Sequence, residues 1–291
     1  MSLWQVIVLG IIQGLTELLP VSSSAHVVVA EKLMGLDPSS PQMTLLLVML
    51  HTGTMFAVIV FFWGRWRRTF SAGAAAGGAS LGNYVLLLLL ATVITGVIGE
   101  ALIKVIEKVW MNGTPHSEVE MLFGHLELIA PALALVGLLI LAAGLLAPSS
   151  SPTSGRKGVN ATSAAMIGAV QGLCLPFRGF SRSGATISTA MLAGVEKASA
   201  EDFSFALAVI LTPPAVAREL LRVIKAEHAG SGVGLSSAAG VSLLGFFCAF
   251  LAGLLALKWL SKWLEAGRWS WFGIYCLFAA AGVFVLHHSG Y

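Results

Sequence analysis

The sequence has 291 residues, of which 57% are hydrophobic and only 11% are charged. Soluble domains carry charge on about 25% of their residues, so the composition excludes a soluble globular protein and predicts a polytopic membrane protein. The formal net charge of +3 is small. In a membrane protein it reflects Lys and Arg in the loops, so we expect no nucleic-acid partner.

Six stretches are long and apolar enough to be membrane spans, each of which needs roughly 20 mostly apolar residues. They are Met43–Trp63, Tyr84–Ile103, Leu126–Ala147, Phe203–Leu221, Leu235–Leu257 and Trp271–His287. Because backbone polar groups must be satisfied inside the bilayer, we expect these spans to be helices and the fold to be all-α.

Two further apolar stretches are interrupted by proline before they reach the length of a span. Leu3–Leu19 stops at Pro20 and is followed by Val21–Gly35, and Ala161–Leu175 stops at Pro176 and is followed by Arg178–Val195. Each pair predicts a re-entrant helical hairpin with a broken tip. Irregular backbone at membrane depth is tolerated only inside protein or beside a wet cavity, so the tips indicate a site.

The two hairpins carry related sequences. Gly168-Ala-Val-Gln-Gly-Leu173 repeats the pattern of Gly10-Ile-Ile-Gln-Gly-Leu15. So short a match in apolar sequence also arises by chance, but a hairpin followed by three spans occurs in the same order in both halves. The second half then begins on the opposite face, as an inverted repeat. We expect a first repeat at 1–147, a linker at 148–160 and a second repeat at 161–291.

Short loops rich in Arg and Lys predict the orientation, because such loops face the cytoplasm. By the span count, three of them share one face: Arg65, Arg67 and Arg68; Arg156 and Lys157; and Lys258, Lys262 and Arg268. Arg222 and Lys225 fall on the other face, so the bias is modest. The first hairpin is expected to open to the outer side.

Glu17 is a lone carboxylate at membrane depth, which costs about 3 kcal/mol on insertion scales. Gln13 lies four residues earlier, on the same helix face. Such a carboxylate either pairs with a buried Arg as a structural group, binds a divalent cation or takes a proton.

Ser22, Ser23 and Ser24 begin the next half-helix, where backbone N–H groups and hydroxyls favour an anion. His26 projects to the same face, so either Ser23 or His26 is the candidate nucleophile or general base. His51 lies within a span, and we expect it to form an internal hydrogen bond.

Arg182 is the counterpart of Glu17 in the second hairpin. Its planar fork of donors suits phosphate oxygens, and the neighbouring Ser181, Ser183 and Thr186 supply hydroxyls. A salt bridge with Glu17 is the alternative role. Arg178 either widens the phosphate clamp or extends to the membrane interface.

Both hairpin motifs resemble the signatures of the bacterial undecaprenyl-pyrophosphate phosphatases, the bacitracin-resistance family. Gln13 and Glu17 fit the first signature. Gly179 to Thr186 fit the second, although Arg178 occupies the position of its proline. The resemblance covers the whole chain in span order. It implies an inner-membrane enzyme that hydrolyses the C55 polyprenyl pyrophosphate on the periplasmic side, with a divalent cation such as Mg or Ca.

The resemblance also implies roles for the site residues. Glu17 would hold the cation or act as base, Arg182 would hold the pyrophosphate, and Ser23 or His26 would attack or relay protons. The substrate-binding set would be Gln13, Ser22, Ser24, Ser181, Ser183, Thr186 and Arg178. The implied partners are the lipid substrate, the bilayer, bacitracin as a competitor for the substrate, and a second copy of the chain in a homodimer.

Two other functions share some of these sequence features. A flippase for the lipid phosphate would suit an inverted repeat, which is a transporter architecture. The other class of membrane phosphatase places a His after its Ser-Arg motif, but Ser188 stands six residues after Arg182, so this class is excluded.

Overall fold

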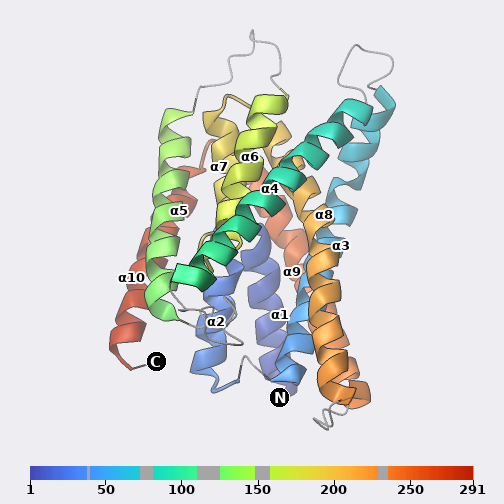
Figure 1. Cartoon of the computed structure of the whole chain (residues 1–291), viewed down its shortest axis with the longest axis vertical. Helices are drawn as coiled ribbons and strands as arrows, with labels where there is room; N and C mark the ends of the chain where they lie inside the picture. The colour runs from blue at the N-terminus through green and yellow to red at the C-terminus, as the bar shows by residue number, and fades with distance from the viewer. Residues whose placement is uncertain (38–39, 73–80, 110–124, 148–157, 229–234, 291) are drawn as a thin grey trace.

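The computed structural model describes residues 1–37, 40–72, 81–109, 125–147, 158–228 and 235–290. Within these ranges every regular element is helical, so the predicted all-α fold is confirmed (Figure 1). The helices are α1 (Leu3–Leu18), α2 (Ser23–Leu33), α3 (Pro41–Ala72), α4 (Leu81–Val109), α5 (Leu126–Leu146), α6 (Ala161–Cys174), α7 (Arg182–Leu192), α8 (Lys197–His228), α9 (Leu235–Glu265) and α10 (Ser270–His288).

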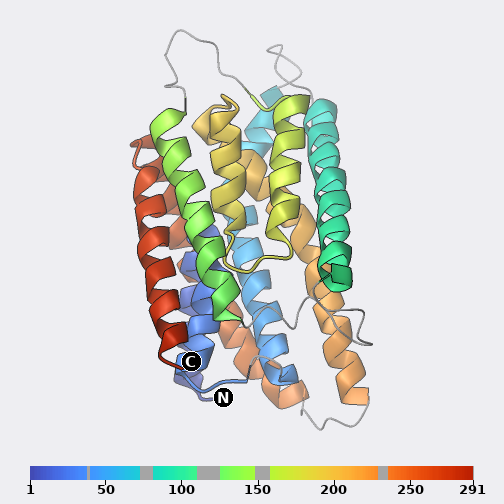
Figure 2. The ribbon, with the colours of Figure 1, turned by 60° about the vertical axis from the view of Figure 1, so that its left-hand side comes forward.

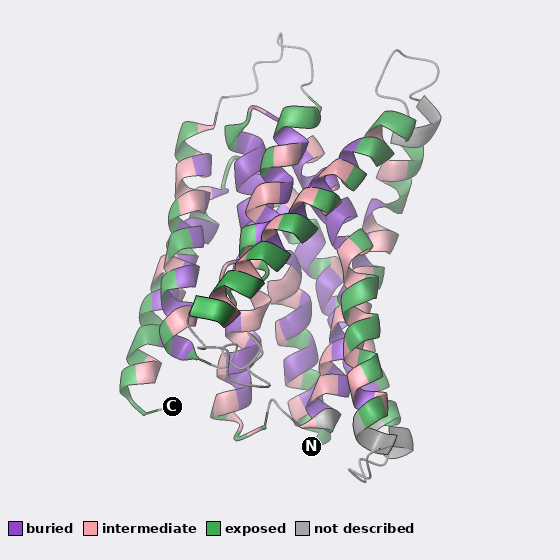
Figure 3. Ribbon diagram, in the orientation of Figure 1, coloured by how far each residue is buried: buried purple, intermediate pink, exposed green. Residues whose placement is uncertain are grey.

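Five helices of the described ranges are long and apolar enough to cross a membrane: α3, α4, α5, α9 and α10. Large apolar side chains of these helices, such as Leu86, Leu145 and Phe278, are exposed, as lipid contact requires. Exposed residues follow the outward faces of the bundle (Figure 3). The chain is therefore a multi-pass membrane protein. The sixth predicted span, Phe203–Leu221, lies within α8, which is not one of these five, so its membrane crossing stays a prediction.

The two interrupted stretches form paired short helices, as the prolines predict. Leu19 has an extended backbone (φ −76°, ψ 151°), because the ring of Pro20 disfavours a helical residue before it. The pair α1 and α2 lies in the half of the bundle nearest the N-terminus. The pair α6 and α7 lies in the opposite half, with its connecting loop about halfway along the bundle (Figure 2).

Each hairpin packs against a long helix of the other half of the chain: α1 lies on α9, and α6 lies on α4. The glycines of the echoed motif make this close approach feasible. A Cβ at Gly14 would lie 2.5 Å from the Ala249 carbonyl oxygen, and a Cβ at Gly168 would lie 2.5 Å from that of Ala91. The two repeats and their boundaries, 1–147 and 161–291, stay a prediction. The linker 148–160 falls largely outside the described residues.

A polar cluster joins three long helices at the end of the bundle where α3 ends. Arg65 of α3 donates from Nη1 to Glu201 Oε2 (3.0 Å) and Asp202 Oδ1 (2.9 Å) of α8. Ser261 of α9 donates to Glu201 Oε1 at 2.6 Å. The buried carboxylate is thus paired, as burial of charge requires.

Candidate active site

The tips of the two hairpins are fastened to each other. Ser183 at the start of α7 donates to the Leu19 carbonyl at 3.3 Å. The Gly179 N–H donates to Ser24 Oγ, also at 3.3 Å. These contacts satisfy polar groups of both broken tips and bring the two predicted motifs together.

Glu17 is the centre of the site. Its Oε2 accepts hydrogen bonds from Gln13 Nε2 (3.2 Å) and Ser23 Oγ (2.5 Å), and its Oε1 accepts one from Arg182 Nη2 (3.0 Å). The predicted helix-face neighbour of Glu17 and its predicted cationic counterpart are therefore both in contact with it. A hydroxyl, an amide and a guanidinium all donate to this carboxylate, and the Glu17 side chain is only 18% exposed.

Arg182 is the first residue of α7, and Ser181 caps that helix by accepting the Gly184 N–H at 3.3 Å. While Nη2 contacts Glu17, Nη1 is buried and has no hydrogen-bond partner. A buried donor left unpaired costs free energy, so Nη1 is available for an incoming acceptor such as a phosphate oxygen.

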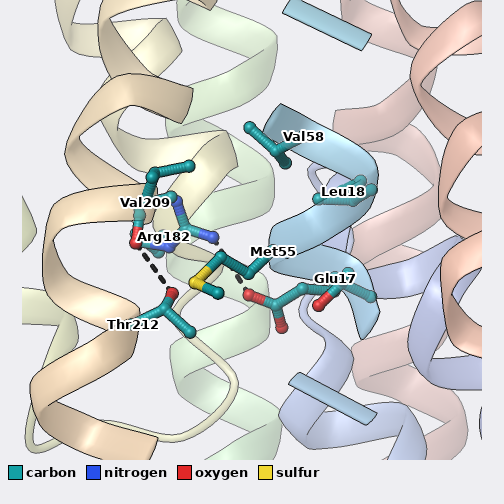
Figure 4. A pocket seen from close by; sticks show the side chains of 9 residues that line it. Glu17, Leu18, Met55, Val58, Arg182, Val209 and Thr212 are labelled. Carbon is teal, nitrogen blue, oxygen red and sulfur yellow. Dashed lines mark hydrogen bonds and ion pairs between the residues drawn. The ribbon is translucent and has the colours of Figure 1, made fainter. Parts of the chain in front are cut away.

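A small, open pocket reaches the Glu17–Arg182 pair between α3 and α8 (Figure 4). Its wall is mostly apolar, with two hydroxyls. The lining residues are Glu17, Leu18, Thr54, Met55, Val58, Arg182, Ala208, Val209 and Thr212.

The hydrogen bonds of the His26 ring are made with Ser22 and Tyr275. Ser22 has a positive φ of 66°, which is strained for a residue with a side chain, and its carbonyl accepts His26 Nδ1–H at 2.8 Å. The other ring nitrogen, Nε2, accepts from the hydroxyl of Tyr275 in α10 at 2.6 Å, and the two rings stack. Both nitrogens of His26 are thus engaged. Tyr275 carried no sequence signal, because it reaches the tip from the last helix.

The structure brings His51 of α3 to the site, which the sequence did not predict. Its Nδ1 contacts the Leu47 carbonyl at 2.8 Å, the expected internal hydrogen bond, but its Nε2 lies 3.9 Å from Glu17 Oε2. This proximity depends on how α3 packs beside α1, and periodicity within α3 carries no sign of it.

The remaining predicted residues have contacts of their own. Thr186 bonds to the hydroxyl of Ser204 in α8 at 2.6 Å and is fully buried, so it braces α7 against α8. Arg178 lies in the loop between α6 and α7. Its positive charge favours the ionised form of Glu31, a fully buried carboxylate of α2. The predicted substrate-binding roles of Arg178, Ser22, Ser24, Ser181, Ser183 and Thr186 stay predictions.

The second copy of the echoed motif, residues 168–173, joins α6 to α4. Gln171 Nε2 donates to Thr95 Oγ1 of α4 at 3.1 Å, and Thr95 donates to the Gly168 carbonyl at 3.0 Å. Thus Gln13 meets a carboxylate, whereas Gln171 fastens α6 to α4. The two echoed glutamines have diverged in what they contact.

Fold and site together define a multi-pass membrane protein with a carboxylate–guanidinium centre between two interlocked hairpins. The family described as bacitracin resistance protein BacA matches residues 6–282, and the chain belongs to this family. It is 54% identical over 287 residues, 97% of both chains, to undecaprenyl-diphosphatase 2 of Acinetobacter baylyi. It is also 34% identical over 298 residues to the undecaprenyl-diphosphatase of Desulfatibacillum aliphaticivorans, with 97% of both chains covered. A third relative, the undecaprenyl-diphosphatase of Christiangramia forsetii, is 33% identical over 295 residues, 99% of this chain and 100% of its own.

Proposed function

We propose that this protein is an undecaprenyl-diphosphatase. It hydrolyses the C55 polyprenyl pyrophosphate to the lipid monophosphate and inorganic phosphate, and so recycles the lipid carrier for peptidoglycan synthesis. The names of its relatives support this activity. The observation that carries it is the placement of Glu17 between a serine hydroxyl and an arginine with one unpaired buried nitrogen.

Ser23 is the nucleophile in this proposal, because its Oγ already donates to Glu17 while both nitrogens of His26 are engaged. Ser23 Oγ attacks the terminal phosphorus and its proton passes to Glu17. The bond from that phosphorus to the bridging oxygen breaks, and the lipid monophosphate leaves. Water then cleaves the phosphoserine bond, with Glu17 passing protons between the water and Ser23. Arg182 Nη1 holds the transferred phosphoryl oxygens, where charge neutralisation matters most.

A divalent cation, Mg or Ca, would be held at Glu17. Arg182 and Glu17 neutralise each other as an ion pair. The negative charge of a bound pyrophosphate would therefore need a further positive charge. The described residues contain no group of three or more His, Cys, Asp or Glu side chains suited to a metal. One carboxylate together with substrate phosphates is nevertheless a common way to bind Mg²⁺, so the residues fit. The cation would supply charge neutralisation on the phosphate oxygens.

The test of the activity is phosphate release from C55 pyrophosphate by the purified protein, with and without a chelator. We expect release that falls on chelation and recovers when Mg²⁺ or Ca²⁺ is added back. Bacitracin added to the substrate should suppress it. A protein that only moved the lipid phosphate across the bilayer would leave phosphate release at background, which would refute hydrolysis and support the flippase alternative.

The orientation that we propose places the first hairpin and the active site on the periplasmic side of the inner membrane. The support is the Arg and Lys content of the end where α3 and α9 finish. In a variant whose native cysteines are replaced by alanine, Ser289→Cys should react in intact cells with a thiol reagent that does not cross the inner membrane. Ala266→Cys, in the exposed turn between α9 and α10, should react only after the cells are opened. The reverse pattern would place the site on the cytoplasmic side.

A further inference from the structure

The Leu47 carbonyl sets the tautomer of His51, and the other ring nitrogen, Nε2, faces Glu17. Nδ1 of His51 lies 2.8 Å from the Leu47 carbonyl, which can only accept, so Nδ1 carries the hydrogen. In the neutral ring, Nε2 then carries a lone pair and no hydrogen. This nitrogen lies 3.9 Å from Glu17 Oε2, too far for a hydrogen bond. Two electron-pair donors therefore face each other.

A positive group between Nε2 and Oε2 would interact favourably with both atoms, and a bound cation can fill this role as well as a proton on His51. Arg182 contacts the other carboxylate oxygen, Oε1, while Ser23 and Gln13 donate to Oε2. Two ligands bound to one ion at about 2.1 Å each can lie up to about 4.2 Å apart. The observed separation falls within that span, and the His51 side chain is 43% exposed, which leaves it accessible to an ion.

We propose that His51 Nε2 is a nitrogen ligand of the divalent cation, and that it binds the ion together with Glu17 Oε2. The proposal rests on the cation assigned to Glu17 in the proposed function. Gln13 provides no second carboxylate in the first motif, and His51 supplies a neutral nitrogen as the second protein ligand. Because imidazole suits transition metals such as Zn²⁺ and Ni²⁺ whereas oxygen ligands suit Ca²⁺, we expect this chain to bind such transition metals more tightly than Ca²⁺.

Mn²⁺ binding to the purified full-length protein tests the assignment without reference to activity. Pulsed electron paramagnetic resonance detects the ¹⁴N nucleus of an imidazole bonded directly to Mn²⁺, and a Mn²⁺ titration gives the affinity. We expect a ¹⁴N signal in the native protein. His51→Gln should lose this signal and bind Mn²⁺ at least about 10-fold more weakly. His51→Asp should keep Mn²⁺ binding without the signal and gain affinity for Ca²⁺.

His288→Gln is the matched control, because His288 also bonds to the carbonyl four residues earlier, at 3.1 Å, but sits at the exposed end of α10. It should change neither the signal nor the affinity. A ¹⁴N signal that persists in His51→Gln, or native protein that binds no Mn²⁺, would overturn the proposal. If His51→Gln does not fold, loss of the signal in a folded His51→Asp variant decides the question. A native protein that shows the signal but releases no phosphate would refute the proposed function and leave the ligand assignment standing.

Discussion

Arg182→Lys is expected to lower the rate of phosphate release by about 100-fold or more, the scale of losing a preorganised donor to a developing charge. Arg182 uses Nη2 for Glu17 and leaves Nη1 without a partner, and the proposed mechanism assigns Nη1 to the substrate. A lysine ammonium is a single point of charge on a flexible stem, so it cannot hold both partners in one geometry. The measurement is the turnover of C55 pyrophosphate by the purified variant.

The lysine variant keeps the positive charge, so Glu17 is not left unpaired and folding should be preserved, as a thermal melt would show. Arg182→Ala should be equally inactive, but it leaves a buried carboxylate without its cation, which is strongly destabilising. Arg268→Lys, in the exposed turn between α9 and α10, is the matched control and should retain full activity. Near-normal turnover by Arg182→Lys would reject the phosphate-holding role.

Glu17→Gln is expected to lower turnover by about 100- to 10,000-fold, the range contributed by a positioned acid or base. The amide keeps the shape of the carboxylate and can still accept from Ser23, but it takes up no proton and offers no charge to a cation. The variant should be assayed as purified protein across a titration of Mg²⁺ and Ca²⁺, and added cation should not rescue it.

Gln13→Glu tests whether position 13 serves to position Glu17 or limits the charge of the site. It adds a second carboxylate one helical turn from Glu17, where Gln13 now donates to Oε2 at 3.2 Å, and we expect it to retain activity and to bind a divalent cation more tightly. Glu127→Gln, on an exposed carboxylate of α5, is the surface control. If Glu17→Gln turned over at the native rate, Glu17 would be a structural partner of Arg182, and the chemistry would rest on Ser23 and His26 alone.

Local signals predicted much of the fold and the centre of the site. Pro20 ends the apolar run that becomes α1. The four-residue spacing of Gln13 and Glu17 places them in contact, and Ser22 caps α2. The salt bridge between Glu17 and Arg182, which the sequence offered as the alternative role of Arg182, is present, since a buried charge needs a partner.

The parts that the sequence did not reveal depend on packing between distant helices. His51 was expected only to bond within its helix, yet its second nitrogen faces Glu17 because α3 packs beside α1. His26 does contact Ser22, but its ring is held by Tyr275, 249 residues later in the chain. Thr186 faces α8 through Ser204. Spacing along one helix cannot show which neighbour covers each of its faces.

The division of the site between the two hairpins sets an order of events during synthesis. Glu17 is made 165 residues before Arg182, an interval of roughly 8 to 33 seconds at about 5–20 residues per second. Until then the carboxylate has no guanidinium, and the tip of the first hairpin lacks the Ser183 hydroxyl that caps Leu19. The contacts that join the two hairpins therefore cannot form until α7 has been synthesised, and assembly of the candidate site waits for the second half of the chain.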